Sequence, residues 1–336
     1  MRTLPATVEE IRLRAHVDGE LRPEHFETVR VPLRHADLGQ VLVRNLLLRV
    51  GAATRTLMAA EKVLPMDPYQ PGRPLGGAAL GEVVEAPGTG LSPGDLVRHD
   101  HGWQQYALLP ATAVRPLTPG RWPDPAACLS QGFAGWLAVD RTGVRAGDTV
   151  LVTGAAGGVG TIAGQFARLR GAGRLIGTTS APWKAERLRS ELGFDAVLVR
   201  GRGTIAGQVR EAAPDGVDVV VDTVGGEQFE AAVSCAARGA RCAVVGAVGR
   251  QAEGGTRAPA TLDTLELISR GIGVQGLSVS DHQASAARWE TEFSAGLRDG
   301  RLSFPHVRLT GLGRAPDALL DLLAGRHLGA VLVEIP

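Results

Sequence analysis

The stretch GAAGGVGTIAGQ (residues 154–165) follows directly after the apolar run DTVLVT (148–153). A glycine-rich turn between a strand and a helix lets the backbone approach a phosphate, and the N–H groups that open the helix face that anion. Gly154, Gly157 and Gly160 fit the spacing G-x-x-G-x-x-G between a strand and a helix. Similar turns also occur with nothing bound, so the flanking segments must decide between a phosphate site and a tight loop.

The chain after about residue 125 alternates between short apolar runs and helix-like stretches. The apolar runs lie at 150–153, 174–179, 196–199, 217–221 and 241–245, and the helix-like stretches at 161–170, 184–192, 203–213 and 228–237. This alternation predicts βαβ units and therefore a parallel sheet. Further on we expect a strand at 273–279, a helix at 286–298 and a closing strand at 330–335, with a mobile loop at 251–260.

Residues 11 to about 125 have a different sequence pattern. Short segments rich in β-branched residues, such as 40–44 and 81–85, are separated by proline and glycine at 71–74, 87–88 and 93–95. Such punctuation is typical of a small, mostly antiparallel β domain. A length of 336 residues also favours two domains over one.

Composition narrows the classes of partner and location. The net charge of +1 gives no electrostatic reason to expect nucleic acid or a membrane surface as a partner. No run approaches the ~18 apolar residues that span a bilayer, and residues 1–20 lack the apolar core of a signal peptide, so we expect a cytoplasmic protein. The three cysteines have no regular spacing, which favours buried small side chains over a disulfide framework or a zinc cluster.

The end of the second apolar run indicates which nucleotide would bind. An NAD site usually places an acidic residue there for the ribose 2′-hydroxyl, whereas this run ends GTTS (177–180) without an acid. Lys184 follows within reach and Arg200 ends the next run, so Ser180 with two cations suits a 2′-phosphate. The alternative is that Lys184 and Arg200 are solvated surface charges. The missing acid favours NADP(H).

Four motifs carry a resemblance to a known family. They are GWQQYA (102–107), AAGGVG (155–160) with Gln165, VDVVVDTVGG (217–226) and GRHLGAVLV (325–333). In these motifs the chain resembles the zinc-independent medium-chain dehydrogenases/reductases, in the branch of quinone oxidoreductases, prostaglandin reductases and alkenal double-bond reductases.

The resemblance implies an α/β fold in which a Rossmann domain is inserted into a GroES-like β domain, and it implies a homodimer. The Rossmann domain would span 126–272, and the GroES-like domain would combine residues 1–125 with residues 273–336. The implied cofactor-binding residues are Gly157, Gly158 and Val159 at the pyrophosphate, Ser180, Lys184 and Arg200 at the 2′-phosphate, Thr223, Val224, Gly246 and Ala247 along the nucleotide, and Leu277 and Val279 near the nicotinamide.

His99 and His101 form a possible metal pair, because imidazole nitrogens are good zinc ligands. A catalytic zinc needs a third protein ligand, and the zinc-dependent branch of the resembled family supplies a cysteine and a G-H-E segment. The corresponding stretch LGGAALG (75–81) has no histidine, and three cysteines cannot build a four-cysteine site. We therefore expect polar loop residues here and chemistry without a metal.

The chemistry implied is hydride transfer from NADPH to the β-carbon of an activated alkene, or to a quinone. The enolate oxygen then needs hydrogen-bond donors, and the α-carbon needs a proton. Reductases of the resembled family often use a tyrosine after the strand that closes the nucleotide domain, where this chain reads GLSVSDH (276–282). His282 aligns best with that tyrosine and Ser280 is the second candidate. The alternative is that His282 is an exposed histidine after a strand.

Two further departures concern the expected substrate pocket. The family's V-D-P-Y-M-R segment is VGAATR here (50–55), and its final G-K is Gly329-Ala330, preceded by His327 in place of asparagine. These changes predict a substrate of different size or polarity, or a modified reaction. Three functions stay open: a reductase of enones or quinones, a biosynthetic tailoring enzyme that reduces or cyclises a complex intermediate, and an NADPH-binding sensor or structural protein with little catalysis.

Overall fold

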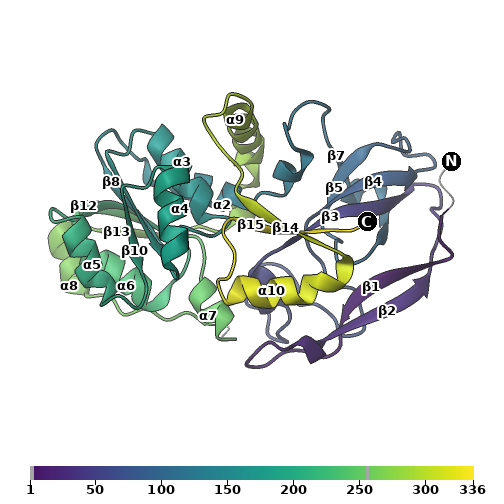
Figure 1. Ribbon diagram of the computed structural model, residues 1–336, viewed down its shortest axis with the longest axis horizontal. Coiled ribbons are helices and arrows are strands. Elements are labelled where there is room, and N and C mark those ends of the chain that lie inside the picture. The colour runs from purple at the N-terminus through teal and green to yellow at the C-terminus, as the bar shows by residue number, and fades with distance from the viewer. Residues whose placement is uncertain (1–3, 255–256) are drawn as a thin grey trace. The chain divides into compact units, whose positions relative to one another are not determined.

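The computed structural model describes residues 4–254 and 257–336, and its contacts divide the chain into two compact units (Figure 1). The first, here the β unit, consists of Met1–Ser130, His306–Arg326 and Val331–Pro336. The second, here the nucleotide unit, consists of Gln131–Pro305 and His327–Ala330. No described helix is long and apolar enough to cross a membrane.

The β unit is built on a seven-stranded sheet in the order β14-β15-β3-β4-β5-β7, with β6 paired to β3. A two-stranded antiparallel ribbon, β1-β2, accompanies it. The strands are β1 (Thr7–Leu13), β2 (Phe26–Pro32), β3 (Gln40–Val50), β4 (Ala79–Glu85), β5 (Leu96–His99), β6 (Tyr106–Pro110), β7 (Arg115–Pro116), β14 (His306–Thr310) and β15 (Ala330–Glu334). The ladders that join β3 to β4, β6 and β15 are antiparallel, as the sequence predicts.

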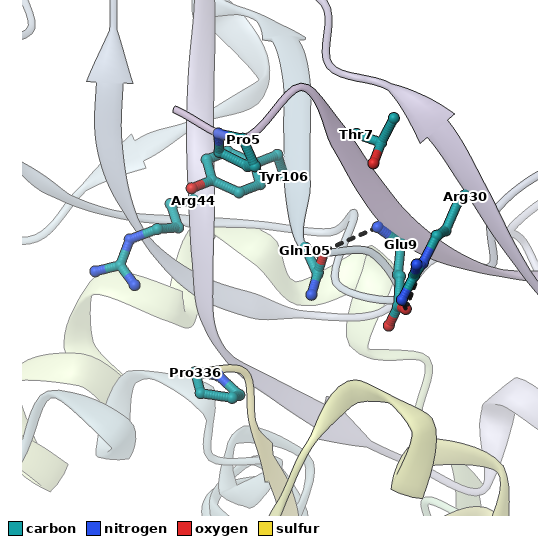
Figure 2. A pocket seen from close by; sticks show the side chains of 8 residues that line it. All are labelled: Pro5, Thr7, Glu9, Arg30, Arg44, Gln105, Tyr106 and Pro336. Atoms are coloured by element: carbon teal, nitrogen blue, oxygen red, sulfur yellow. Dashed lines mark hydrogen bonds and ion pairs between the residues drawn. The ribbon is translucent and has the colours of Figure 1, made fainter. Parts of the chain in front are cut away.

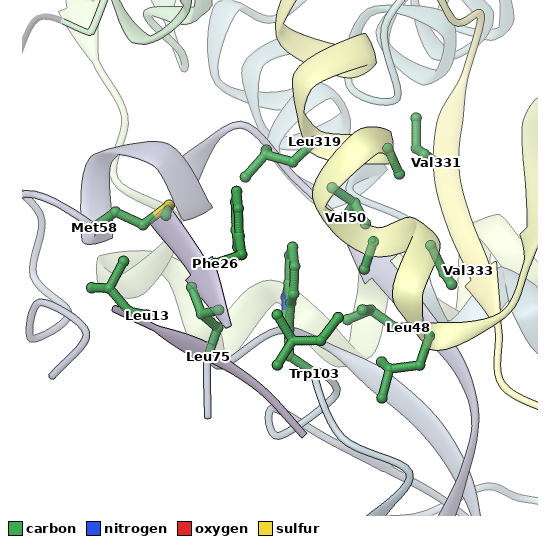
Figure 3. Close-up of a cluster of buried hydrophobic side chains, with 14 of the residues drawn as sticks. Leu13, Phe26, Leu48, Val50, Met58, Leu75, Trp103, Leu319, Val331 and Val333 are labelled. Carbon is green, nitrogen blue, oxygen red and sulfur yellow. The ribbon is translucent and has the colours of Figure 1, made fainter. Parts of the chain in front are cut away.

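The core of the β unit lies where β3 and β15 meet the helix α10 (Ala315–Leu323) (Figure 3). Leu48 and Val50 of β3 point into it, and Trp103 of the predicted motif 102–107 is completely buried there beside Phe26, with the two rings stacked 5.8 Å apart. Burial of such large side chains contributes about 2–3 kcal/mol each. Trp103 of this motif is therefore a core residue.

The nucleotide unit contains a six-stranded parallel sheet in the order β10-β9-β8-β11-β12-β13. Numbered from β8, this is the order 3-2-1-4-5-6 of dinucleotide-binding folds, in which ligands bind where the order reverses, at the carboxyl ends of the strands. Its strands are β8 (Thr149–Val152), β9 (Arg174–Thr179), β10 (Ala196–Val199), β11 (Val217–Asp222), β12 (Ala236–Val244) and β13 (Gly273–Gly276).

Helices cover both faces of this parallel sheet. One face packs Leu151, Ile176 and Val220 against α5, α6 and α8, and the other is covered by α2, α3 and α4, with α9 packed on α2. The helices are α2 (Gly132–Thr142), α3 (Gly160–Leu169), α4 (Pro182–Leu192), α5 (Ile205–Ala212), α6 (Gly226–Ser234), α7 (Val248–Ala252), α8 (Thr264–Arg270) and α9 (Ala286–Arg298); α1 (Ala53–Leu57) and α10 belong to the β unit. The predicted fold class, a doubly wound parallel sheet with an antiparallel β domain, is confirmed.

The structure differs from the expected boundaries at three places. The predicted return to the β unit at 273 falls too early, because β13 pairs with β12 and α9 packs on α2, so the return comes after Pro305. The helix expected to reach 237 ends at Ser234, since Val217 pairs with Ala236 and draws that segment into the sheet. The expected loop at 251–260 begins inside α7, and its residues 255–256 lie outside the described residues.

Candidate dinucleotide site

The glycine turn connects β8 to α3 at the point where the strand order reverses. Gly154 has a φ of +59°, which favours glycine, and its N–H donates to Thr178 Oγ1 at 3.0 Å. Thr178 in turn donates to Gln228 Oε1 at 2.7 Å. These bonds join the turn to β9 and α6, so its conformation is fixed before any ligand arrives.

The three glycines of the motif have different structural roles. A Cβ at Gly160 would lie 2.5 Å from the carbonyl oxygen of Gly154, so this glycine is required for the helix to start against the turn. A Cβ at Gly157 would lie 3.4 Å from its nearest neighbour, the same oxygen, which is an ordinary contact. Gly157 is exposed, has no positive φ and is therefore not required by the fold. A glycine with open space above it fits a phosphate that approaches the backbone.

Gly158 is more closely packed than Gly157. A Cβ there would lie 2.8 Å from Gln131 Oε1 and 3.3 Å from the Cα of Ala330. The segment that contains Ala330 also supports the turn, because Gly329 N–H donates to the carbonyl of Ala156 at 2.8 Å. Val159 is the N-cap residue of α3. In the first turn the N–H of Thr161 already donates to the carbonyl of Gly157 at 3.0 Å, so an anion would be met by the other N–H groups at this helix start.

The end of β11 shapes the loop on the other side of the turn. Asp222 is completely buried. It accepts hydrogen bonds from Thr153 Oγ1 at 2.5 Å and from the N–H of Gly225 at 2.8 Å. Burial raises the pKa of Asp222, and these hydrogen bonds oppose the rise. Sequence reasoning singled out the Asp222 motif but not Thr153, whose role depends on the neighbouring strand.

The three residues predicted at the 2′-phosphate come from one corner of the sheet. Ser180 follows β9 and Arg200 follows β10, and the N–H of Arg200 donates to the carbonyl of Thr179 at 2.9 Å, so the two positions lie side by side. Both side chains are exposed. For Arg200 this placement is compatible with a phosphate ligand and with a solvated charge.

Lys184 differs from Arg200 because it is buried. It lies in the first turn of α4, only 3% of its surface is exposed, and its Nζ is 5.5 Å from the centre of the Trp183 ring. Burial lowers its pKa. The interpretation of Lys184 as a solvated surface charge is therefore wrong.

The remaining predicted cofactor residues follow the carboxyl ends of neighbouring strands. Thr223 uses its hydroxyl to donate to the carbonyl of Thr153 at 2.8 Å, so that hydroxyl has an internal partner. Val224, Leu277 and Val279 are buried or half-buried, and Gly246 packs closely, since a Cβ there would lie 2.8 Å from the carbonyl oxygen of Thr223. Ala247 is the N-cap residue of α7. The topology therefore brings all of these backbone positions to one edge of the sheet.

His282 lies in the 3₁₀ helix η4 (Val279–Ser285), with Nδ1 3.3 Å from Nη2 of Arg141. Arg141 is in the last turn of α2, whereas Gly135 packs against the glycine turn, since a Cβ there would lie 2.6 Å from the carbonyl oxygen of Val159. Arg141 and Gly135 are six residues apart on α2, which is about 9 Å along the helix axis. The contact between Arg141 and His282 therefore lies about that far along α2 from the residue that packs against the glycine turn. Ser280 is exposed and close to Leu277 in sequence.

His99 and His101 lie close to each other at the end of β5. Their rings lie 6.4 Å apart at 34°, and His99 Nδ1 accepts a hydrogen bond from the N–H of His101 at 3.1 Å. His99 is buried, and its Nε2 has no hydrogen-bond partner among the described residues. The stretch of chain that the structure describes contains no group of three or more His, Cys, Asp or Glu residues that could hold a metal ion. Cys128, Cys235 and Cys242 are all buried thiols, as predicted.

Acid should destabilise the protein through His99. Burial, followed by the charge of His101, lowers the pKa of His99 to about 4, against 6.5 for an ordinary histidine. The unfolded chain takes up this proton below about pH 6.5 and the folded chain only below about pH 4. We therefore expect the free energy of unfolding to fall by about 3 kcal/mol as the pH drops from about 6.5 to about 4.

The matched variant for this prediction is His99→Asn, whose side-chain oxygen can still accept from the N–H of His101 but does not titrate. Urea unfolding between pH 4.5 and 7.5 should give a shallower pH dependence for the variant than for the wild type. Parallel curves for the two proteins would contradict the assignment.

A separate cavity of about 340 Å³ lies in the β unit (Figure 2). It is lined by Pro5, Thr7, Glu9, Arg30, Arg44, Gln105, Tyr106 and Pro336. Its two arginines are already paired, Arg30 with Glu9 at 3.1 Å and Arg44 with Glu82 at 2.7 Å. None of the predicted site residues lines this cavity, so we do not connect it with the chemistry.

Comparison with known proteins agrees with this fold. Residues 158–294 match the family model of zinc-binding dehydrogenases, and residues 9–117 match that of the N-terminal domain of oxidoreductases. The chain is 29% identical to the putative NADP-dependent oxidoreductase YfmJ of Bacillus subtilis (99% of each chain) and 27% identical to prostaglandin reductase 1 of Rattus norvegicus (96% of this chain and 97% of that one).

Among solved structures, CurA of Vibrio vulnificus in complex with NADPH superimposes with a TM-score of 0.90 at 24% identity, over 98% of this chain and 99% of that one. At this identity the likeness concerns the fold. Together with the family models, these matches show that the chain belongs to the medium-chain dehydrogenase/reductase family, in the branch of quinone and enone reductases, and is an oxidoreductase.

Proposed function

We propose that the protein is an NADPH-dependent reductase of the activated C=C bond of α,β-unsaturated carbonyl compounds or of quinones, and that it works without a metal. NADP(H) is its cofactor, as in the NADP-dependent relatives. The observation that carries the proposal is Gly157. It is exposed in the turn between β8 and α3, at the point where the strand order reverses, and packing does not require a glycine there. The prostaglandin reductase relative supports the choice of an enone.

In this proposal the residues of the chain bind and orient the reactants. The backbone of 157–159 would hold the pyrophosphate, and Ser180, Lys184 and Arg200 the 2′-phosphate. When bound, NADPH supplies the hydride that adds to the β-carbon of the substrate. The carbonyl oxygen then carries the developing charge and needs N–H or O–H donors, and the α-carbon takes a proton from a side chain or from water.

The first experiment is a fluorescence titration with NADPH and NADH, followed by NADPH oxidation against a panel of enones and quinones. Tight binding of NADPH together with turnover is the expected result. Tight binding without turnover of any member of the panel would contradict a reductase of simple enones and quinones. It would favour an enzyme that acts on a biosynthetic intermediate, or a sensor. Binding of neither cofactor would contradict the nucleotide site itself.

Ser280 is better suited than His282 to serve as the donor. The hydroxyl of Ser280 is exposed and makes no hydrogen bond to a described residue, whereas His282 lies against Arg141. We therefore expect His282→Ala to change kcat by less than about 3-fold and Ser280→Ala to lower it by about 10-fold or more. Steady-state kinetics with a saturating enone measures both. The opposite order of effects would restore His282 as the proton donor.

We also propose that the protein is a homodimer in which β13 pairs with its counterpart. β13 is an edge strand of the parallel sheet with four exposed residues, and Val274 within it is 41% exposed. On the preceding helix α8, Leu265 and Ile268 are 71% and 77% exposed. An unpaired edge beside apolar side chains suits pairing with a second copy about a two-fold axis.

Replacing these apolar groups by charges should give a monomer. We expect Val274→Arg combined with Ile268→Glu to halve the mass measured by light scattering, because two charges would be buried at the interface. The matched control is Leu169→Glu, at an exposed leucine of α3. A monomeric wild type, or a dimer that survives the double substitution, would contradict the proposed interface.

A further inference from the structure

Arg49 is a cation in the middle of the central sheet of the β unit. It is the last residue but one of β3, between Leu48 and Val50, which point into the apolar core (Figure 3). Because side chains alternate along a strand, Arg49 points to the opposite face. Arg98 lies on that same face, since Leu47 pairs with Leu80 and Leu80 with Arg98 across the neighbouring strands.

The hydrogen bonds of Arg49 are incomplete. Its Nη1 donates to the carbonyl of Leu129 at 3.2 Å, and this is its one side-chain hydrogen bond within the described residues. Its Nε is buried and has no partner there. A guanidinium carries a fork of N–H donors, and buried donors without an acceptor are costly. The edge formed by Nε and Nη2 therefore lacks the acceptors that it requires.

The charge of Arg49 is also unbalanced. Burial, followed by the charge of Arg98, lowers its pKa to about 10, so the group is still a cation at neutral pH. Asp100 acts in the opposite direction but makes no ion pair with Arg49, and Arg98 has no ion pair in the described chain. Two neighbouring cations without a paired carboxylate create a local positive potential.

Tyr69 does not neutralise this charge. Its hydroxyl donates to the carbonyl of Gly76 at 3.0 Å and also bonds Thr54, and burial raises its pKa to about 12. It is therefore neutral at physiological pH and engaged with other partners. The Nε and Nη2 edge of Arg49 therefore has no anionic partner among the described residues.

We propose that Arg49 binds a carboxylate group of the substrate side-on through Nε and Nη2, with Arg98 providing a second positive charge. The planar fork of a guanidinium matches the two oxygens of a carboxylate. Two residues after Arg49 in the sequence come the small residues Gly51, Ala52 and Ala53. Neither a carboxylate that would compete for Arg49 nor a bulky ring therefore stands at these positions.

This inference rests on the proposed function, because it specifies the class of enone: one that carries a carboxylate away from the reacting double bond. The test compares 6-oxohept-4-enoate with its methyl ester as substrates, and 6-oxoheptanoate with its methyl ester as ligands that cannot be reduced at a C=C bond. Binding is measured by titration calorimetry on the full chain in the presence of NADP⁺, and turnover by NADPH oxidation.

The wild type should bind the saturated keto acid at least about 10-fold more tightly than its ester, with a preference that weakens as salt is added. Arg49→Gln should abolish this preference. Arg98→Gln should reduce it, and it provides a second test if Arg49→Gln does not fold. The control is Arg44→Gln, on the same strand but paired with Glu82, which should retain the preference.

Equal binding of acid and ester by the wild type, or a preference that survives in both Arg49→Gln and Arg98→Gln, would overturn the assignment. The two proposals fail separately. Turnover of both substrates without a preference for the acid would contradict the carboxylate site and support the proposed reductase activity. Selective binding of the keto acid without turnover would support the carboxylate site and contradict the proposed reductase activity.

Discussion

Gly157→Val should abolish NADPH binding while leaving the protein folded. The isopropyl group would occupy the open space above the turn and prevent the pyrophosphate from approaching the backbone, so we expect affinity to fall by at least about 100-fold. Stability should change by less than about 1 kcal/mol, because the position is exposed and its nearest neighbour would lie 3.4 Å from the new Cβ. Fluorescence titration measures the first effect and urea unfolding the second.

Gly160→Val provides the contrast within the same motif. There the Cβ would lie 2.5 Å from the carbonyl oxygen of Gly154 and 2.7 Å from the Cα of Ala155, both of which are backbone atoms that cannot move aside. We expect a loss of more than about 3 kcal/mol of stability. If Gly157→Val also unfolds the protein, or if it binds NADPH normally, the division of the motif into a ligand glycine and a packing glycine is wrong.

Removing the charge of Lys184 should separate the two cofactors. Lys184→Met keeps most of the buried stem and removes the ammonium group, so a lost charge-assisted contact should weaken NADPH by about 10- to 100-fold. NADH has no 2′-phosphate, and its affinity should change by less than about 3-fold. Lys184→Ala should show the same selectivity with an additional loss of stability, because the lysine stem is buried.

The control for this experiment is Arg187→Met. Arg187 lies one turn further along α4 and pairs with Glu191 at 2.6 Å on the exposed side of the helix, so its removal should affect neither cofactor. Equal weakening of NADPH and NADH by Lys184→Met would show that the 2′-phosphate binds elsewhere and that the lysine supports the fold of the corner.

The elements with a regular pattern could be predicted from the sequence alone. The strands and helices of the nucleotide unit follow from their apolar periodicity and the glycine turn, and α9 was predicted at its observed bounds of 286–298. The pattern failed where a distant partner decides the outcome. Ala236 became a strand because Val217 pairs with it, and Gly273–Gly276 joined the nucleotide unit because β12 offers a free edge.

The sequence by itself determined the family and the fold, and it predicted a corner for the 2′-phosphate, because these depend on local spacing and on residue types that follow successive strands. Only the tertiary structure distinguished Gly157 from Gly160, placed His282 beside Arg141, and left Arg49 with an unpaired edge. Each of these depends on which atoms from distant segments come within a few ångströms. Spacing along the chain carries no record of those distances, because they are set by packing and strand pairing.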